Sequence, residues 1–120
     1  MEGCYTGTRI KTIYNVKTDC VDNYESKIKY EIKKINCCQY IVYQYNLTSG
    51  HFYKLLCFNN EGTLTSTSLG GIDRFEKDGN KFVHYWSIPE KNGKLINACT
   101  EIKKTNCSCD CDCRDYCGCY

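Results

Sequence analysis

Thiols are the groups in this chain most able to do chemistry. The chain has 120 residues, of which 12 are cysteines, and half of the cysteines stand in its last fourteen residues. In an extended segment, alternate side chains share one face. A row of thiols on one face can bind soft metal ions as thiolates, or it can form disulfides. The cysteines of this tail are Cys107, Cys109, Cys111, Cys113, Cys117 and Cys119.

Most of the cysteines outside the tail are further candidates for disulfides. Cys4 stands in a short N-terminal segment, and an arm with one cysteine beside a tail with six suits disulfides between subunits. Cys4 and the six tail cysteines are therefore the candidates for intermolecular disulfides, although a bridge from Cys4 within the chain is equally open. Cys37 and Cys38 are neighbours that would point to opposite faces of a strand, so separate partners are expected for them. Together with Cys20 they are the other disulfide candidates, whereas Cys57 and Cys99 lie inside strand patterns.

The tail resembles a segment of a metallothionein. The likeness rests on the repeat Cys107-x-Cys109-x-Cys111-x-Cys113 followed by Cys117-x-Cys119. In metallothioneins, such repeats bind zinc, cadmium or copper(I) in thiolate clusters. The resemblance covers the tail alone and implies Zn or Cu(I) bound by these six cysteines as an alternative function. Otherwise no cofactor is expected.

Composition narrows the classes of function. The net charge is +2 at pH 7, and the lysines are dispersed among apolar residues, as on a solvated strand face, so nucleic acid is not an expected partner. No run approaches the roughly 18 apolar residues of a membrane span. Residues 1–7 are polar and lack the apolar region of a secretory signal.

The sequence offers few candidates for catalysis. Its two histidines are His51, which follows a turn signal and is expected to be exposed, and His84. His84 shares a strand face with Phe82 and Trp86, where a buried, hydrogen-bonded histidine is expected. A catalytic cysteine needs a neighbouring base, and no phosphate loop or Gly-x-Ser-x-Gly motif is present. We therefore expect no enzymatic activity and no catalytic residue.

Hydrophobic alternation predicts an all-β fold. About eight strand patterns follow one another, separated by turn signals such as Asp78-Gly79 and Asn92-Gly93. This spacing is typical of a sandwich, here an eight-stranded one of jelly-roll type. We expect an N-terminal arm (1–8), a β-sandwich domain (9–104) and a cysteine-rich tail (105–120). The pattern at 38–47 is almost continuously apolar, which predicts a strand buried on both faces.

The plan and composition also resemble bacterial spore-coat and spore-appendage proteins. Such proteins are small, rich in cysteine and tyrosine, and made without a signal peptide; this chain has 11 tyrosines. The resemblance implies synthesis in the cytosol followed by oxidation at an extracellular, spore or cell surface, with a cytoplasmic location as the alternative. An exposed edge strand would be the natural docking surface between subunits.

Three functions follow from these observations. The first is a self-assembling structural protein, a subunit of a filament, coat or lattice, whose partner is another copy of itself and whose contacts are reinforced by disulfides. The second is the metallothionein-like metal binder. The third is a secreted binding module stapled by disulfides, which would remain a monomer with intramolecular bonds only.

Overall fold

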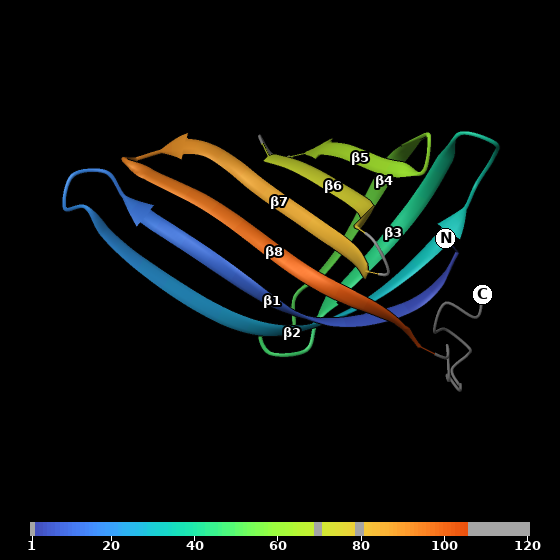
Figure 1. The fold of residues 1–120 in the computed structure, drawn as a ribbon, viewed down its shortest axis with the longest axis horizontal. Helices are drawn as coiled ribbons and strands as arrows, with labels where there is room; N and C mark the ends of the chain where they lie inside the picture. The colour runs from blue at the N-terminus through green and yellow to red at the C-terminus, as the bar shows by residue number, and fades with distance from the viewer. Residues whose placement is uncertain (1, 69–70, 79–80, 106–120) are drawn as a thin grey trace.

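Eight antiparallel strands form a closed barrel in the computed structural model of this chain, which describes residues 2–68, 71–78 and 81–105 (Figure 1). Each strand pairs with its neighbours in the sequence, and β1 closes the barrel against β8. Among the described residues no helix is long and apolar enough to cross a membrane. The strands are β1 (Gly3–Asn15), β2 (Cys20–Lys34), β3 (Gln39–Asn46), β4 (Phe52–Asn60), β5 (Thr63–Ser68), β6 (Gly71–Asp78), β7 (Lys81–Lys91) and β8 (Lys94–Thr105).

The prediction of an eight-stranded all-β fold is confirmed, but the jelly-roll-like sandwich is wrong. Closure comes from a long antiparallel pairing of β1 with β8, which runs from Cys4 opposite Thr105 to Asn15 opposite Lys94. Alternating side chains have one buried and one exposed face in a sandwich and in a barrel alike. The pattern therefore predicted the strands without predicting that the first strand meets the last.

Closure also changes the expected docking surface. Every described strand has a neighbour on both sides, so none of the described strands is a free edge along its whole length. The shortest ladder joins β4 to β5, where only Phe58, Asn59 and Asn60 pair with residues 63–65. The remainder of β4, Phe52 to Cys57, pairs on its β3 side alone.

The expected N-terminal arm is largely part of the barrel. Strand β1 begins at Gly3, so residues 3–8 pair with β2 and residues 4–8 pair with β8 as well. At the other end of the chain, β8 continues to Thr105. Residues 106–120, which hold all six tail cysteines, lie outside the described residues.

The expectation that the segment 38–47 is buried on both faces is wrong. In β3, Tyr40, Val42 and Gln44 are buried while the residues between them are only half-buried. The inward residues face the barrel and the outward residues, including Ile41 and Tyr43, lie on its surface. Outward apolar side chains thus mimicked a strand buried on both faces.

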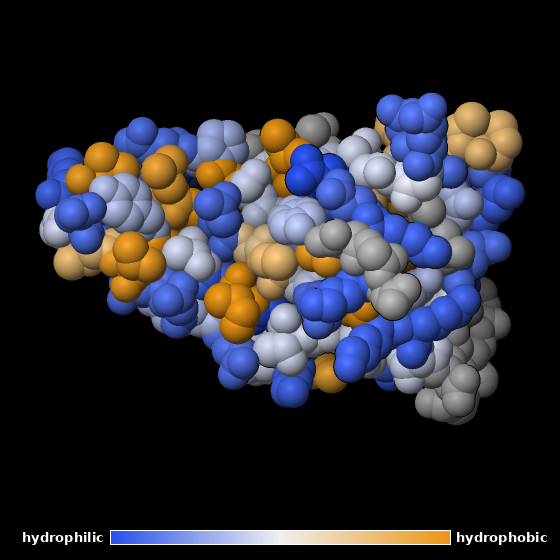
Figure 2. Space-filling view, viewed as in Figure 1, coloured by the Kyte–Doolittle hydropathy of each residue, from blue (hydrophilic) through white to orange (hydrophobic). Residues whose placement is uncertain are grey.

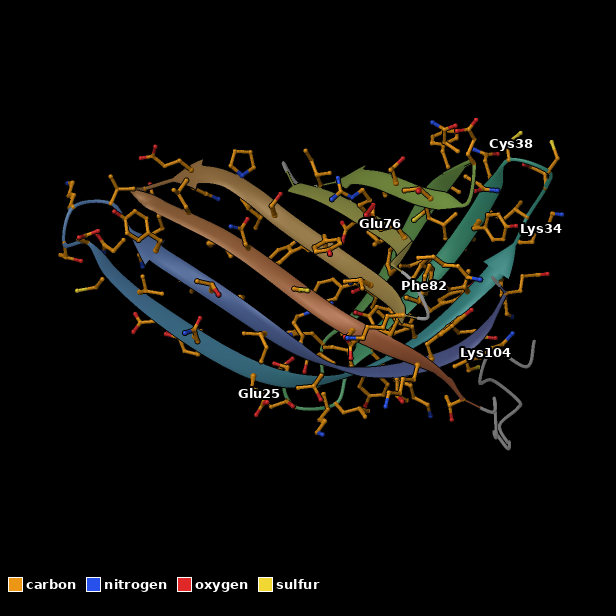
Figure 3. The ribbon with its side chains drawn as sticks, viewed as in Figure 1. Glu25, Lys34, Cys38, Glu76, Phe82 and Lys104 are labelled. Carbon is orange, nitrogen blue, oxygen red and sulfur yellow. The ribbon has the colours of Figure 1, made fainter. Side chains whose placement is uncertain are left out.

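The apolar core fills one end of the barrel. It contains Tyr30 and Phe75, whose rings meet edge to face with centroids 5.9 Å apart, and Phe82, which points into the interior (Figure 3). Each fully buried large side chain stabilises the fold by about 1.5–3 kcal/mol. The buried cluster comprises Tyr5, Ile28, Tyr30, Ile32, Tyr40, Val42, Leu55, Cys57, Leu64, Phe75 and Ile102.

The opposite end of the barrel is open because the strands differ in length. Strands β1, β2, β7 and β8 have 11 to 15 residues, whereas β3 to β6 have six to nine. The β1–β2 and β7–β8 hairpins therefore project beyond the other strands, at the left of Figure 1. The amide of Val16 joins the two hairpins by donating to the carbonyl of Gly93 at 2.9 Å. The resulting shape measures 47 × 30 × 28 Å.

Candidate functional site: a polar cup inside the barrel

A cavity of about 460 Å³ lies inside the open end of the barrel. Its lining comes from inward positions of β1, β2, β3, β4, β6 and β7, so closure of the barrel is what assembles it. We call this cavity the cup. Its lining comprises Arg9, Lys11, Tyr24, Ser26, Gln44, Asn46, Ser49, His51, Tyr53, Leu55, Asp73, Trp86 and Ile88.

Arg9 lies where the cup meets the core. Its Nη2 donates to Gln44 Oε1 at 2.7 Å and to the Tyr30 hydroxyl at 3.3 Å, and its Nε donates to Thr100 Oγ1 at 3.3 Å. These three acceptors come from β3, β2 and β8. Four strands therefore hold one guanidinium in place, and all three acceptors are uncharged.

A buried chain of hydrogen bonds continues from Arg9 to Asp73. The Tyr30 hydroxyl lies 2.8 Å from His84 Nδ1, and His84 Nε2 lies 2.7 Å from Asp73 Oδ1. Burial, with a smaller contribution from Arg9, lowers the pKa of His84 below its usual value and outweighs the opposite effect of Asp73. The imidazole is therefore neutral, Nε2–H donates to Asp73, and Nδ1 accepts from Tyr30.

Tyr30 remains protonated in this chain. Burial raises the pKa of its hydroxyl, and this effect prevails over the nearby positive charge of Arg9. The side chains of Tyr30 and His84 are each only 1% exposed, and the His84 ring stacks on Phe75 with centroids 4.0 Å apart. This layer is polar, buried and hydrogen-bonded, which gives Arg9 a rigid support.

The electrostatics of the cup favour a negative charge. Arg9 and Lys11 supply two cations to its lining, against the single carboxylate of Asp73. Asp73 is buried, and its carboxylate accepts from His84 rather than from Arg9. Within the described part of the chain no carboxylate lies within ion-pair distance of Arg9. The guanidinium thus keeps an uncompensated charge at the bottom of the cup.

Aromatic and aliphatic side chains form the walls of the cup. Tyr24 and Tyr53 come from β2 and β4, and Trp86 and Ile88 come from β7. Trp86 is the single tryptophan of the chain. A cavity with apolar and aromatic walls and a few placed polar groups is the usual form of a small-molecule site.

The two histidines lie where the sequence predicted them. His84 is buried and hydrogen-bonded to Tyr30 and Asp73, with Arg9 Nη2 3.5 Å from its Nδ1, as expected for its strand face. His51 is exposed, at the rim of the cup, and contacts Ser49 Oγ at 3.0 Å. The prediction therefore identified His84 but not its partners.

Six of the cysteines lie within the described residues, whereas the six tail cysteines that the sequence singled out lie outside them. Cys20, Cys37, Cys38 and Cys99 are exposed free thiols, of which Cys37 and Cys38 share the turn between β2 and β3, and Cys57 is a buried free thiol. Cys4 is buried on β1 and is disulfide-bonded. Burial raises the pKa of Cys57 to about 12, so this thiol is inert.

Cys37 and Cys38 depart from their expected geometry. The prediction of opposite strand faces is wrong, because both lie in the turn between β2 and β3, where Cys38 marks the tip (Figure 3). Asn36 Oδ1 accepts from the amides of Cys38 and Gln39 and shapes this turn. The two sulfur atoms are 3.2 Å apart, and their hydrogen bond raises the pKa of Cys38.

Sequence reasoning missed Arg9, Gln44 and Asp73. A signal for Arg9 exists, because Tyr5, Gly7 and Arg9 share one strand face and the first of these is a core residue. Reading that signal requires knowing that β1 begins at Gly3 rather than at Arg9. Among the described residues there is no group of three or more metal-ligating side chains.

Comparison with models of protein families finds no match to this chain, and comparison with curated proteins finds none either.

Proposed function

We propose that this protein is a small-molecule-binding barrel whose ligand occupies the cup. This proposal shares only the role of binding with the third function that the sequence left open, a secreted binding module stapled by disulfides. The observation that carries the proposal is the cup itself, a cavity of about 460 Å³ inside a closed barrel. Ligand cavities in proteins fall at about 300–1,000 Å³.

The division of the barrel interior supports this proposal. Eight-stranded barrels are either filled with side chains or wide enough to hold one small ligand. Here the apolar cluster around Phe75 fills one end, and the layer from Arg9 to Asp73 separates it from the cavity. Hydrogen bonds join the polar groups of this layer to one another, so the layer forms a rigid polar floor beneath the cavity.

Trp86 provides a direct test, because the only indole of the chain lines the cup. We expect a neutral aromatic probe, N-phenyl-1-naphthylamine, to quench the emission of Trp86 with saturation at one molecule per chain. Ser26→Phe fills the cup and should weaken this binding at least tenfold. The matched control is Thr6→Phe, on the exposed outer face of β1, which should leave binding unchanged.

Two results would contradict the proposal. One is the absence of saturable quenching by any member of a panel of small aromatic probes. The other is equal loss of binding in Ser26→Phe and Thr6→Phe, which would place the probe outside the cup.

A second candidate function is disulfide-reinforced self-assembly, favoured by the outer surface of β3 and β4. Tyr45, Phe52, Leu56 and Phe58 are outward residues, each 46–59% exposed. Apolar residues also interrupt the charged surface over the projecting hairpins (Figure 2). Exposed apolar patches mark interaction sites. In this proposal the tail cysteines join copies of the chain, and the exposed Cys20, Cys37 and Cys38 are further candidates for disulfides.

Intact mass of the unreduced protein tests self-assembly. Covalent multimers that collapse to a single 13.9 kDa species on reduction support it. A monomer that persists at high concentration under oxidising conditions excludes it. Metal carried by the same sample, and thiols that react only after chelation, would instead support the metallothionein-like alternative for Cys107 to Cys119.

A further inference from the structure

Arg9 keeps hydrogen-bonding capacity that none of the described residues uses. A guanidinium has five N–H groups and does not lose its proton. The bonds that Arg9 makes use Nε and Nη2, and its Nη1 has no hydrogen-bond partner among the described residues. Since Arg9 lines the cup, two N–H groups and a full positive charge are available to a molecule bound there.

The surroundings of Arg9 do not neutralise this charge. Its nearest partners are hydroxyl, amide and neutral imidazole groups, and the Asp73 carboxylate is bonded to His84. Lys11 adds a second cation two residues along the same face of β1, closer to the rim. An anionic group that reaches the bottom of the cup would meet both cations in a partly desolvated setting, where charge-assisted bonds are strongest.

Asp73 limits the charge of such a ligand. Its carboxylate also lines the cup, so a doubly charged group such as a phosphate monoester meets repulsion that a carboxylate largely avoids. The walls formed by Tyr24, Tyr53 and Trp86 suit a flat ring rather than a long flexible chain. The cavity volume of about 460 Å³ accommodates one or two fused rings with a short side chain.

From these observations we infer that the cup binds small aromatic monocarboxylates, with the carboxylate on Arg9 Nη1 and the ring between Tyr24, Tyr53 and Trp86. The inference rests on the proposed binding function and specifies its ligand. Arg9 is the residue that recognises the anion. Gln44, Tyr30 and Thr100 are positioning residues that fix the direction of its guanidinium.

Isothermal titration of the full chain with two matched probes tests the inference. The probes are 1-naphthaleneacetate and its neutral analogue 1-naphthaleneacetamide, which share ring and shape. We expect the carboxylate to bind about tenfold to a hundredfold more tightly than the amide, as charge-assisted hydrogen bonds differ from neutral ones. A third probe, 1-naphthyl phosphate, should bind more weakly than the carboxylate at pH 8, where it carries two charges.

Variants assign the preference to one residue. Arg9→Gln should remove the preference for the carboxylate while leaving the amide affinity within about threefold. The control Arg74→Gln makes the same change on the outer face, where Arg74 pairs with Glu76 at 2.9 Å, and should leave both affinities unchanged. If Arg9→Gln does not fold, the comparison of the probes on the unaltered chain still shows whether the cup prefers a carboxylate.

The outcomes separate this inference from the proposed function. Equal affinity for carboxylate and amide overturns the ligand class while the binding function stands. Tighter binding of the phosphate than of the carboxylate also overturns it. Binding of none of the three probes, and of none of the neutral aromatic panel, overturns the binding function and this inference together.

Discussion

At the scale of the residue, the polar layer of the barrel depends on His84 remaining neutral. Its imidazole donates to Asp73 and accepts from Tyr30, and a protonated ring cannot accept. The pKa of His84 in the folded chain lies below its ordinary value of 6.5. The unfolded chain therefore binds a proton more readily, and acidification favours unfolding.

We predict that the free energy of unfolding decreases as the pH falls from 7.5 to 5.5. The contribution of His84 is fully present above its unfolded pKa of 6.5 and is lost as the pH falls toward its lower folded pKa. The slope should not exceed about 1.4 kcal/mol per pH unit. Urea unfolding at a series of pH values measures it. His84→Gln should reduce this pH dependence, whereas the control His51→Gln, at an exposed position, should preserve it. Equal slopes in the native chain and in His84→Gln would show that His84 does not cause the pH dependence.

The sequence predicted part of this site. The alternation of Phe82, His84 and Trp86 was enough to predict a buried histidine. It was not enough to predict Asp73 or Arg9 as neighbours, because they come from β6 and β1. Which inward residues of distant strands meet depends on closure and register, and neither is encoded in the pattern of a single strand.

At the scale of the element, Gly7 explains why the sequence predicts that the first strand begins at residue 9, whereas β1 begins at Gly3. A Cβ atom at Gly7 would lie 2.5 Å from the Glu101 carbonyl oxygen and 2.8 Å from Ile102 Cγ2. Close approach of β1 and β8 thus requires glycine at an inward position. A glycine weakens the strand signal in the sequence, and the N-terminal residues read as an arm.

We predict that Gly7→Ala lowers the free energy of unfolding by about 1–3 kcal/mol, because backbone and buried side chains must move to admit the methyl group. Thermal and urea unfolding measure the change. The control is Thr6→Ala, one residue away on the exposed face, which should remain within about 0.5 kcal/mol of the native chain. Equal stability of the native chain and Gly7→Ala would show that β1 and β8 do not meet as described.

The eight strands themselves were predictable from alternation and turn residues. Alternation and turn residues could not distinguish a sandwich from a closed barrel. Outward apolar residues such as Tyr45 and Phe52 obscured which face of β3 and β4 is buried. Pairing of β1 with β8 joins the two ends of the domain, a contact that no local pattern reports.

At the scale of the whole molecule, the barrel is closed unevenly. Thirteen residue pairs join β1 to β2, whereas three join β4 to β5. Backbone amides near a short ladder open at lower free energy than those inside long ladders. The junction of β4 with β5 is therefore the weakest part of the closed sheet.

We predict that amide hydrogens of Phe52 to Cys57 in β4 that lack a partner on the β5 side exchange with solvent at least a hundredfold faster than those in the centre of β1. Hydrogen exchange measured residue by residue by NMR gives both rates. Gly7 to Ile10, which pair on both sides, provide the internal reference. Uniform protection around the barrel would mean that β4 and β5 are joined by more than the three residue pairs between them.

The measurement that tests the central claim most directly is a two-dimensional ¹H–¹⁵N NMR titration of the chain with 1-naphthaleneacetate. Ligand binding in the cup predicts shifts of the Trp86 indole N–H and the Arg9 Nε–H, together with backbone amides of Ser26, Gln44 and Asp73. Resonances on the outer face of β3 and β4, such as those of Tyr45 and Phe58, should stay in place. Shifts confined to that outer face, or no shift for any small aromatic ligand, would contradict a ligand-binding barrel.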